Sequence, residues 1–164
     1  LPQLVEGTLE LPATPPVGGG YPTESPTITP ISIWLDAWNE FVLLRNDYVD
    51  RANKINDSVP ASTNPPDSFI EEYRGLRNWL IESGPLSFVT SAGLPELLEA
   101  DNLNDRIAKW AENEAETLRL YIHHLETSSA VSFEQSQYLF DQNLLDWERI
   151  WDEVEAMRQG WREL

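Results

Sequence analysis

The fold is decided by residues 30–56, which read PISIWLDAWNEFVLLRNDYVDRANKIN. Apolar side chains recur in this stretch at steps of three and four residues, which is the spacing of an amphipathic helix. Pro30 suits the first position of such a helix, and Thr29 suits the cap before it. The stretch therefore predicts a helix from about residue 29 to residue 56. Its apolar stripe consists of Trp34, Trp38, Phe41, Tyr48, Ala52 and Ile55, and it is widened by Leu35, Val42 and Val49.

The next part of the chain predicts a loop, a second helix and short helical turns. The loop covers residues 57–67 and contains three prolines. Ser68 with Glu71 three residues later forms a capping-box pattern, which predicts the start of a helix. Gly84 and Pro85 predict its end. Residues 86–100 then read as one or two short helical turns.

Two long helices are predicted in the remainder. The first starts at Asp101 or Asn102 and ends near residues 127–129. Ser132 with Gln135 forms a second capping-box pattern, so the last helix is expected from about residue 133 to the end of the chain. We therefore predict an all-α fold, a bundle of three or four main helices with short connecting helical turns and an extended Pro-rich N-terminal arm.

The arm covers residues 1–29, and the helical body covers residues 30–164. Prolines crowd the arm, the run GGG occupies positions 18–20, and no basic residue is present. Prolines fix the backbone and remove hydrogen-bond donors, so the arm cannot fold alone. Residues 3–11 partly alternate apolar and polar side chains, which suits an extended segment held by another surface. A flexible tail or linker is the alternative. The candidate contact residues of the arm are Leu4, Val5, Leu9, Leu11 and Tyr21.

The segment at 34–48 is echoed at 147–161. Both copies carry two Trp, a Glu and an Arg at matching positions, although any two Trp-rich amphipathic helices would look partly alike. Arg45 and Arg158 fall on the apolar stripe of their helices, where a charge must be paired or reach water. We expect a carboxylate or aromatic partner for each, either in the same chain or across a subunit interface. Together with Trp161 they are candidate protein-interface residues.

Composition narrows the possible partners. The formal net charge is −17, from 28 acidic and 11 basic residues. Binding to phosphates requires Lys and Arg, so direct contact with nucleic acid and with anionic membrane surfaces is not expected. The absence of cysteine excludes disulfides and thiolate metal sites. No apolar run approaches the length of a membrane span, so we expect a soluble protein.

Signals for enzyme chemistry are weak. His123 and His124 are the only histidines, and as neighbours on a helix they point about 100° apart. His123 shares a face with Glu126, but two ligands are too few for a zinc site. No Gly-rich phosphate loop or nucleophile motif is present. We therefore predict no cofactor, no metal and no enzymatic activity, although a small hydrolase with converging acids is a third, weaker hypothesis.

The favoured hypothesis is a non-enzymatic structural or assembly subunit of a multi-protein complex. The arm would lie along its own bundle or along another protein subunit, of the same or a different chain, and Trp-rich helices would supply core and contact surface. A virus or phage particle is one such setting, by analogy with shells whose subunits are tied by arms. The alternative is a soluble acidic binder or inhibitor of a basic partner, such as a nucleic-acid-binding protein.

Overall fold

The structure, a computed structural model, describes residues 30–58, 66–91 and 93–162. These ranges contain helices and their connections and no strand, which confirms the predicted all-α fold with four main helices. The elements are α1 (Pro30–Asp57), α2 (Asp67–Glu82), α3 (Pro85–Ser91), a 3₁₀ turn η1 (Leu98–Ala100), α4 (Asp101–Thr127) and α5 (Ala130–Arg162). The predicted arm and the predicted cap at Thr29 lie outside the described residues.

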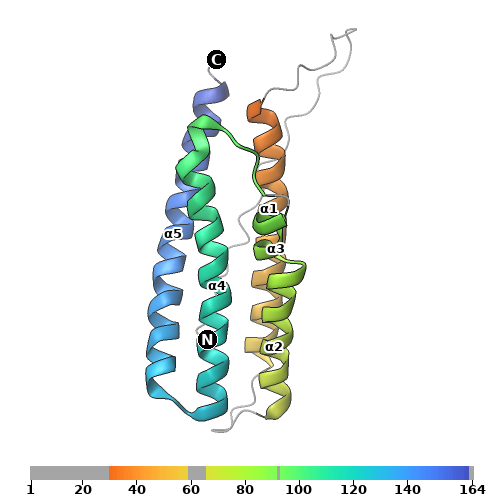
Figure 1. Cartoon of the computed structure of the whole chain (residues 1–164), viewed down its shortest axis with the longest axis vertical. Helices are drawn as coiled ribbons and strands as arrows, with labels where there is room; N and C mark the ends of the chain where they lie inside the picture. Colours follow the sequence, from red (N-terminus) through yellow and green to blue (C-terminus); the bar gives the residue numbers. More distant parts are fainter. Residues whose placement is uncertain (1–29, 59–65, 92, 163–164) are drawn as a thin grey trace.

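The helices form an elongated bundle (Figure 1). α4 and α5 lie side by side and run in opposite directions, and α2 lies beside both α1 and α4. α3 packs near the middle of the bundle against α1, α2 and α4. The start of α1 and the end of α5 lie at the same end of the bundle. The N-terminal half of α1 therefore faces the C-terminal half of α5.

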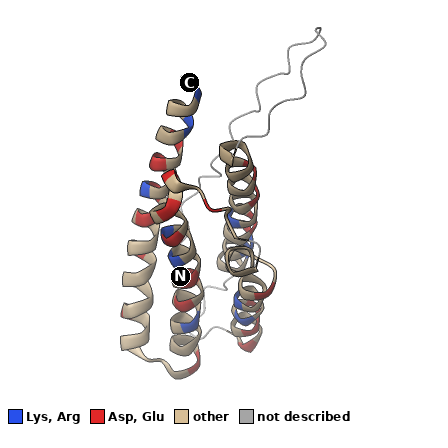
Figure 2. Ribbon diagram, turned by 45° about the horizontal axis from the view of Figure 1, so that its top comes forward, with Lys and Arg blue, Asp and Glu red and all other residues tan. Residues whose placement is uncertain are grey.

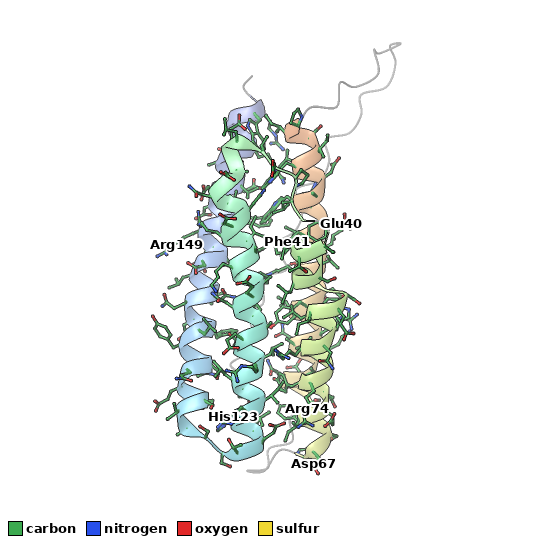
Figure 3. All side chains as sticks on the ribbon, viewed as in Figure 1. Glu40, Phe41, Asp67, Arg74, His123 and Arg149 are labelled. Carbon is green, nitrogen blue, oxygen red and sulfur yellow. The ribbon has the colours of Figure 1, made fainter. Side chains whose placement is uncertain are left out.

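The core is one continuous cluster of buried side chains from every α-helix. Side chains fill the space between the helices, with Phe41 pointing into the bundle and Arg149 pointing away from it (Figure 3). The predicted stripe of α1 is confirmed, because Trp34, Trp38 and Phe41 are fully buried. Charged residues lie mainly on the outer surface, and the first turns of α5 carry little charge (Figure 2).

Both predicted capping boxes are wrong. α2 begins at Asp67, one residue before Ser68, and its cap position is Pro66 without a side-chain hydrogen bond. α5 begins at Ala130, so Ser132 lies inside its first turn. The Ser132 backbone N–H donates instead to the Ser129 Oγ at 3.2 Å. The capping pattern therefore placed the start of each helix too late in the sequence.

The connection between α4 and α5 is short and well defined. Ser128 adopts the left-handed conformation, with φ of 59°, and its N–H donates to the His124 carbonyl at 2.7 Å. The Ser129 hydroxyl then caps α5, as described above. This two-residue link allows α4 and α5 to pack as neighbouring antiparallel helices, which is usual for such short connections.

Candidate functional site

The most distinctive region is the seam between α1 and α5, where large rings fill the space between the two helices. Trp34 and Trp38 of α1 stack with centroids 6.0 Å apart. Trp38 stacks on Trp147 of α5 at 5.6 Å and lies 6.0 Å from Trp151. The two echoed segments, 34–48 and 147–161, therefore contact each other. With Trp110 of α4, six of the seven tryptophans belong to one cluster: Trp34, Trp38, Trp110, Trp147, Trp151 and Trp161.

A buried polar cluster lies next to the tryptophans, where α1, α4 and α5 meet. The Tyr48 hydroxyl donates to the Glu114 Oε2 at 2.7 Å. The Asn143 Nδ2 donates to the Glu114 Oε1 at 2.6 Å and is 2.9 Å from the Trp110 carbonyl oxygen. Both carboxylate oxygens of a buried glutamate are therefore hydrogen-bonded, which is what such a charge requires.

Arg45 supplies the positive charge of this cluster. Its Cζ lies 4.6 Å from the centroid of the Trp147 ring, so it has the aromatic partner that the sequence predicts. Burial lowers the pKa of Arg45 below its usual value, while the charge of Glu114 acts in the opposite direction. Burial raises the pKa of Glu114, and the hydrogen bonds from Asn143 and Tyr48, followed by the charge of Arg45, oppose that rise. The cluster is thus a set of mutually dependent groups in the core.

Arg158 lies at the outer end of the same seam. Its Nη1 lies 3.6 Å from the Glu155 Oε1, and its Nη2 lies 3.4 Å from the Asn39 Oδ1 of α1. Trp161 is partly buried and meets Trp34 edge-on with centroids 6.5 Å apart. The expected carboxylate partner of Arg158 is therefore confirmed within the chain. An interface role for Arg45, Arg158 and Trp161 stays a prediction.

The other candidate residues of the sequence, Leu4, Val5, Leu9, Leu11 and Tyr21, lie outside the described residues. Two residues of the buried polar cluster were missed by the sequence analysis. Glu114 lies between Ile107, Ala111 and Leu118 on the buried face of α4, and Asn143 lies between Phe140 and Trp147 on that of α5. Both interrupt an apolar stripe with a polar side chain, which is the signal that identified Arg45.

Several buried polar atoms of the seam have no hydrogen-bond partner within the described ranges. On α1 these are the Asn46 Oδ1 and the Asn53 Oδ1, and on α5 they are the Gln137 Nε2 and the Asn143 Oδ1. The indole N–H groups of Trp38 and Trp147 are buried and unpaired in the same way. Buried polar groups are nearly always paired, so a row of exceptions needs an explanation.

Sequence spacing places the unpaired amides on facing sides of the two helices. Asn39, Asn46 and Asn53 follow each other at seven-residue steps and so share one face of α1. Arg158 of α5 reaches Asn39, so this face borders α5. Gln137 lies two heptads before Trp151, which contacts α1 through Trp38. The unpaired amide atoms therefore lie toward the C-terminal end of α1 and the N-terminal end of α5, on the far side of the tryptophan cluster from the start of α1.

Comparisons of the chain with protein-family models, with curated proteins and with solved structures give no match. None of the helices in the described ranges combines the length and apolar character that a bilayer crossing requires. Across residues 30–58, 66–91 and 93–162, no group of three or more His, Cys, Asp or Glu side chains could hold a metal ion.

Proposed function

We propose that this chain is a non-enzymatic structural subunit of a multi-protein assembly, and that the α1–α5 seam receives an extended polypeptide segment. The occupant is the N-terminal arm, residues 1–29, of the same chain or of a neighbouring subunit. The observation that carries this proposal is the set of buried side-chain amide atoms on α1 and α5 without a hydrogen-bond partner in the described part of the chain.

An extended segment suits these groups because it offers one N–H donor and one carbonyl acceptor at each non-proline residue. Asn and Gln side chains carry both a donor and an acceptor, so they can bond such a backbone whatever its sequence. Asn46 and Asn53 are about 10.5 Å apart along the axis of α1. That spacing corresponds to about three residues of an extended chain. Apolar side chains of the segment would lie on the aromatic and aliphatic parts of the seam.

The length of the arm allows this arrangement. Its 29 residues span at most about 90 Å when extended as polyproline II, whereas α1 is about 42 Å long. The arm ends at residue 29, directly before Pro30, where α1 begins. It can therefore turn back along the helix that follows it, or reach another subunit. A virus or phage particle is one assembly that uses arms of this kind, and this setting is an analogy with such shells.

Hydrogen–deuterium exchange on the full chain tests the proposal. We expect the backbone amides of residues 3–11 to exchange more slowly than those of a free peptide of the same sequence. Asn53→Ala should reduce this protection, because it removes an amide that would bond the arm. Asn102→Ala, at the exposed start of α4, is the matched control and should leave it unchanged.

Deleting residues 1–29 gives a second measurement. Size-exclusion chromatography with light scattering would compare the truncated and full chains in the presence of their native complex. Normal incorporation of the truncated chain, together with exchange of the arm at the free-peptide rate, would contradict the proposal.

The net charge of −17 favours a second candidate, an acidic binder of a basic partner. Ionic strength separates the two candidates. Binding through this charge weakens steeply as salt is added. Binding of an arm through backbone hydrogen bonds and apolar contacts changes little.

A further inference from the structure

A separate pocket lies between α2 and α4, on surfaces that the α1–α5 seam does not use. Its volume is about 400 Å³, which is within the range of small-molecule sites. Its lining residues are Arg74, Arg77 and Asn78 of α2 with Arg119, Ile122, His123 and Glu126 of α4. About one turn of α2 and two turns of α4 supply these side chains, so the lining is built on regular structure rather than on loops.

Basic residues outnumber acidic residues in the lining of this pocket, although the protein as a whole is acidic. The chain has 28 acidic and only 11 basic residues, yet three arginines and one glutamate line the pocket. Arg74 is held by ion pairs with Glu71 and Glu126. The remaining two arginines therefore decide whether the pocket has charge to offer to a ligand.

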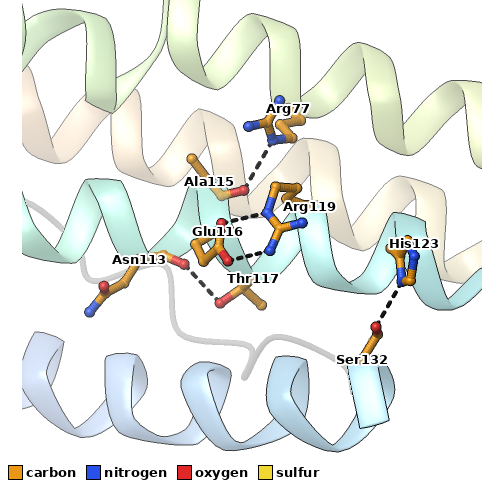
Figure 4. Close-up of polar contacts among 8 residues, drawn as sticks. All are labelled: Arg77, Asn113, Ala115, Glu116, Thr117, Arg119, His123 and Ser132. Atoms are coloured by element: carbon orange, nitrogen blue, oxygen red, sulfur yellow. Dashed lines mark hydrogen bonds and ion pairs between the residues drawn. The ribbon is translucent and has the colours of Figure 1, made fainter. Parts of the chain in front are cut away.

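Arg77 is held in place through its Nε and keeps the terminal edge of its guanidinium unpaired among the described residues. Its Nε donates to the Ala115 backbone carbonyl of α4 at 3.1 Å, as Figure 4 shows. Its two terminal nitrogens have neither a hydrogen-bond nor an ion-pair partner in the part of the chain that the structure describes. The hydrogen bond from Arg119 lowers the pKa of Glu116, and the charges of Arg119 and then Arg77 act in the same direction, but Glu116 is hydrogen-bonded to Arg119 and not to Arg77. The guanidinium is thus fixed in position while its terminal edge remains available.

Arg119 and His123 add further donors from α4 (Figure 4). The Arg119 Nε and Nη2 each donate to the Glu116 carboxylate at 2.7 Å, which fixes the guanidinium and leaves Nη1 available. The His123 Nδ1 lies 2.8 Å from the Ser132 Oγ of α5. In the tautomer in which Ser132 donates to Nδ1, the ring N–H is on Nε2 and can donate to a ligand.

We propose that this pocket binds the oxyanion of a small organic molecule, a phosphate or carboxylate group, with Arg77 as its main contact. A planar guanidinium with a free terminal edge suits two oxygens of one anionic group. Arg119 Nη1 and the His123 ring supply additional donors. The pocket is larger than an inorganic anion, so it leaves space for an organic part, which would lie on Ile122. This site does not depend on docking of the arm.

Titration of the full chain with inorganic phosphate and, separately, with citrate tests the proposal at constant ionic strength set by chloride. Side-chain Nε–H resonances of the arginines, observed by NMR, report binding. We expect a saturable shift of the Arg77 resonance with at least one anion, and the preferred anion identifies the group as phosphate or carboxylate. With binding followed at the Arg119 resonance, Arg77→Gln should raise the dissociation constant about tenfold or more, which equals about 1.4 kcal/mol. Arg77→Lys keeps the positive charge but loses the planar pair of donors, and it should give a smaller increase in the dissociation constant than Arg77→Gln.

Arg149→Gln is the matched control, because Arg149 is an exposed arginine on α5 that pairs with Asp146. It should bind both anions as the native chain does. Arg119→Gln provides a second test if Arg77→Gln fails to fold, and it should also weaken binding. Absence of a saturable shift with both anions, or equal dissociation constants for Arg77→Gln and Arg149→Gln, would overturn the proposal.

Discussion

Tyr48→Phe tests the account of the buried polar cluster. The substitution removes one hydroxyl group and keeps the ring, so the packing of the core changes little. It also leaves the Glu114 carboxylate with Asn143 as its remaining hydrogen-bond donor, since the 2.7 Å bond from Tyr48 is lost. A hydrogen bond to a charged group contributes about 1.5–3 kcal/mol, and both partners are buried here. We expect the free energy of unfolding at neutral pH to fall by about 2 kcal/mol.

The loss should become smaller as the pH is lowered. Burial raises the pKa of Glu114 above its unfolded value. A carboxyl group of this kind contributes stability that is present at acidic pH and is lost as the pH rises through its folded pKa. The Tyr48 hydroxyl opposes the rise in pKa because it stabilises the ionised form. Once Glu114 is protonated, the missing bond is one between neutral groups, which contributes about 1 kcal/mol.

Urea unfolding of the native and variant chains at several pH values measures this difference. Tyr138→Phe is the matched control, because Tyr138 is 68% exposed on α5, and its stability should equal that of the native chain at each pH. If the Tyr48→Phe loss is the same at acidic and neutral pH, the reasoning about an ionised Glu114 is refuted. A loss no larger than that of the control would refute the hydrogen bond itself.

Two further predictions concern the backbone and are checked by urea unfolding. Gly84→Ala should lower the free energy of unfolding by about 1–3 kcal/mol, because a Cβ there would lie 2.9 Å from the Leu80 Cα and from the Trp79 ring. A Cβ at Gly75 would have no atom within 4 Å, so Gly75→Ala should raise the free energy of unfolding by roughly 0.5–1 kcal/mol. Equal effects of Gly84→Ala and Gly75→Ala would contradict this reasoning. Ser128→Gly should stabilise the chain by about 1 kcal/mol, since Ser128 is in the left-handed conformation; an unchanged unfolding midpoint would contradict that.

The helices could be predicted from the sequence because burial on one face imposes a strict spacing on apolar residues. The stripe of α1 is the clearest case, and its end at Asp57 lies one residue beyond the predicted end. The starts of α2 and α5 were predicted less accurately than the end of α1. A Ser with a Glu or Gln three residues later also occurs inside a first turn, where tertiary contacts decide its role. Ser132 is such a case, since its hydroxyl contacts His123 of α4.

The candidate site could be predicted only in part. Arg45 and Arg158 were identified because a charge interrupts an apolar stripe, and that signal is local to one helix. The partners of Arg45 could not be predicted, because Glu114 and Trp147 belong to other helices and meet it only in the assembled bundle. The unpaired Oδ1 of Asn46 was missed for the same reason. An Asn beside a stripe is ordinary on an exposed surface, and it becomes informative only when a facing helix buries it.

The unpaired polar atoms of the α1–α5 seam are the physical basis for proposing that the seam binds a polypeptide segment. A seam filled with apolar side chains would bury similar area without leaving donors and acceptors unpaired. Each buried polar group that lacks a partner destabilises the fold by about 1–3 kcal/mol, and a domain is stable by only about 5–15 kcal/mol. Several such atoms, including the Asn46 and Asn53 Oδ1, would therefore impose a large penalty if neither water nor a bound segment reached them. A bound polypeptide backbone would remove that penalty because it supplies donors and acceptors together. This is the physical reason to expect an extended segment here, rather than an apolar surface of a second bundle.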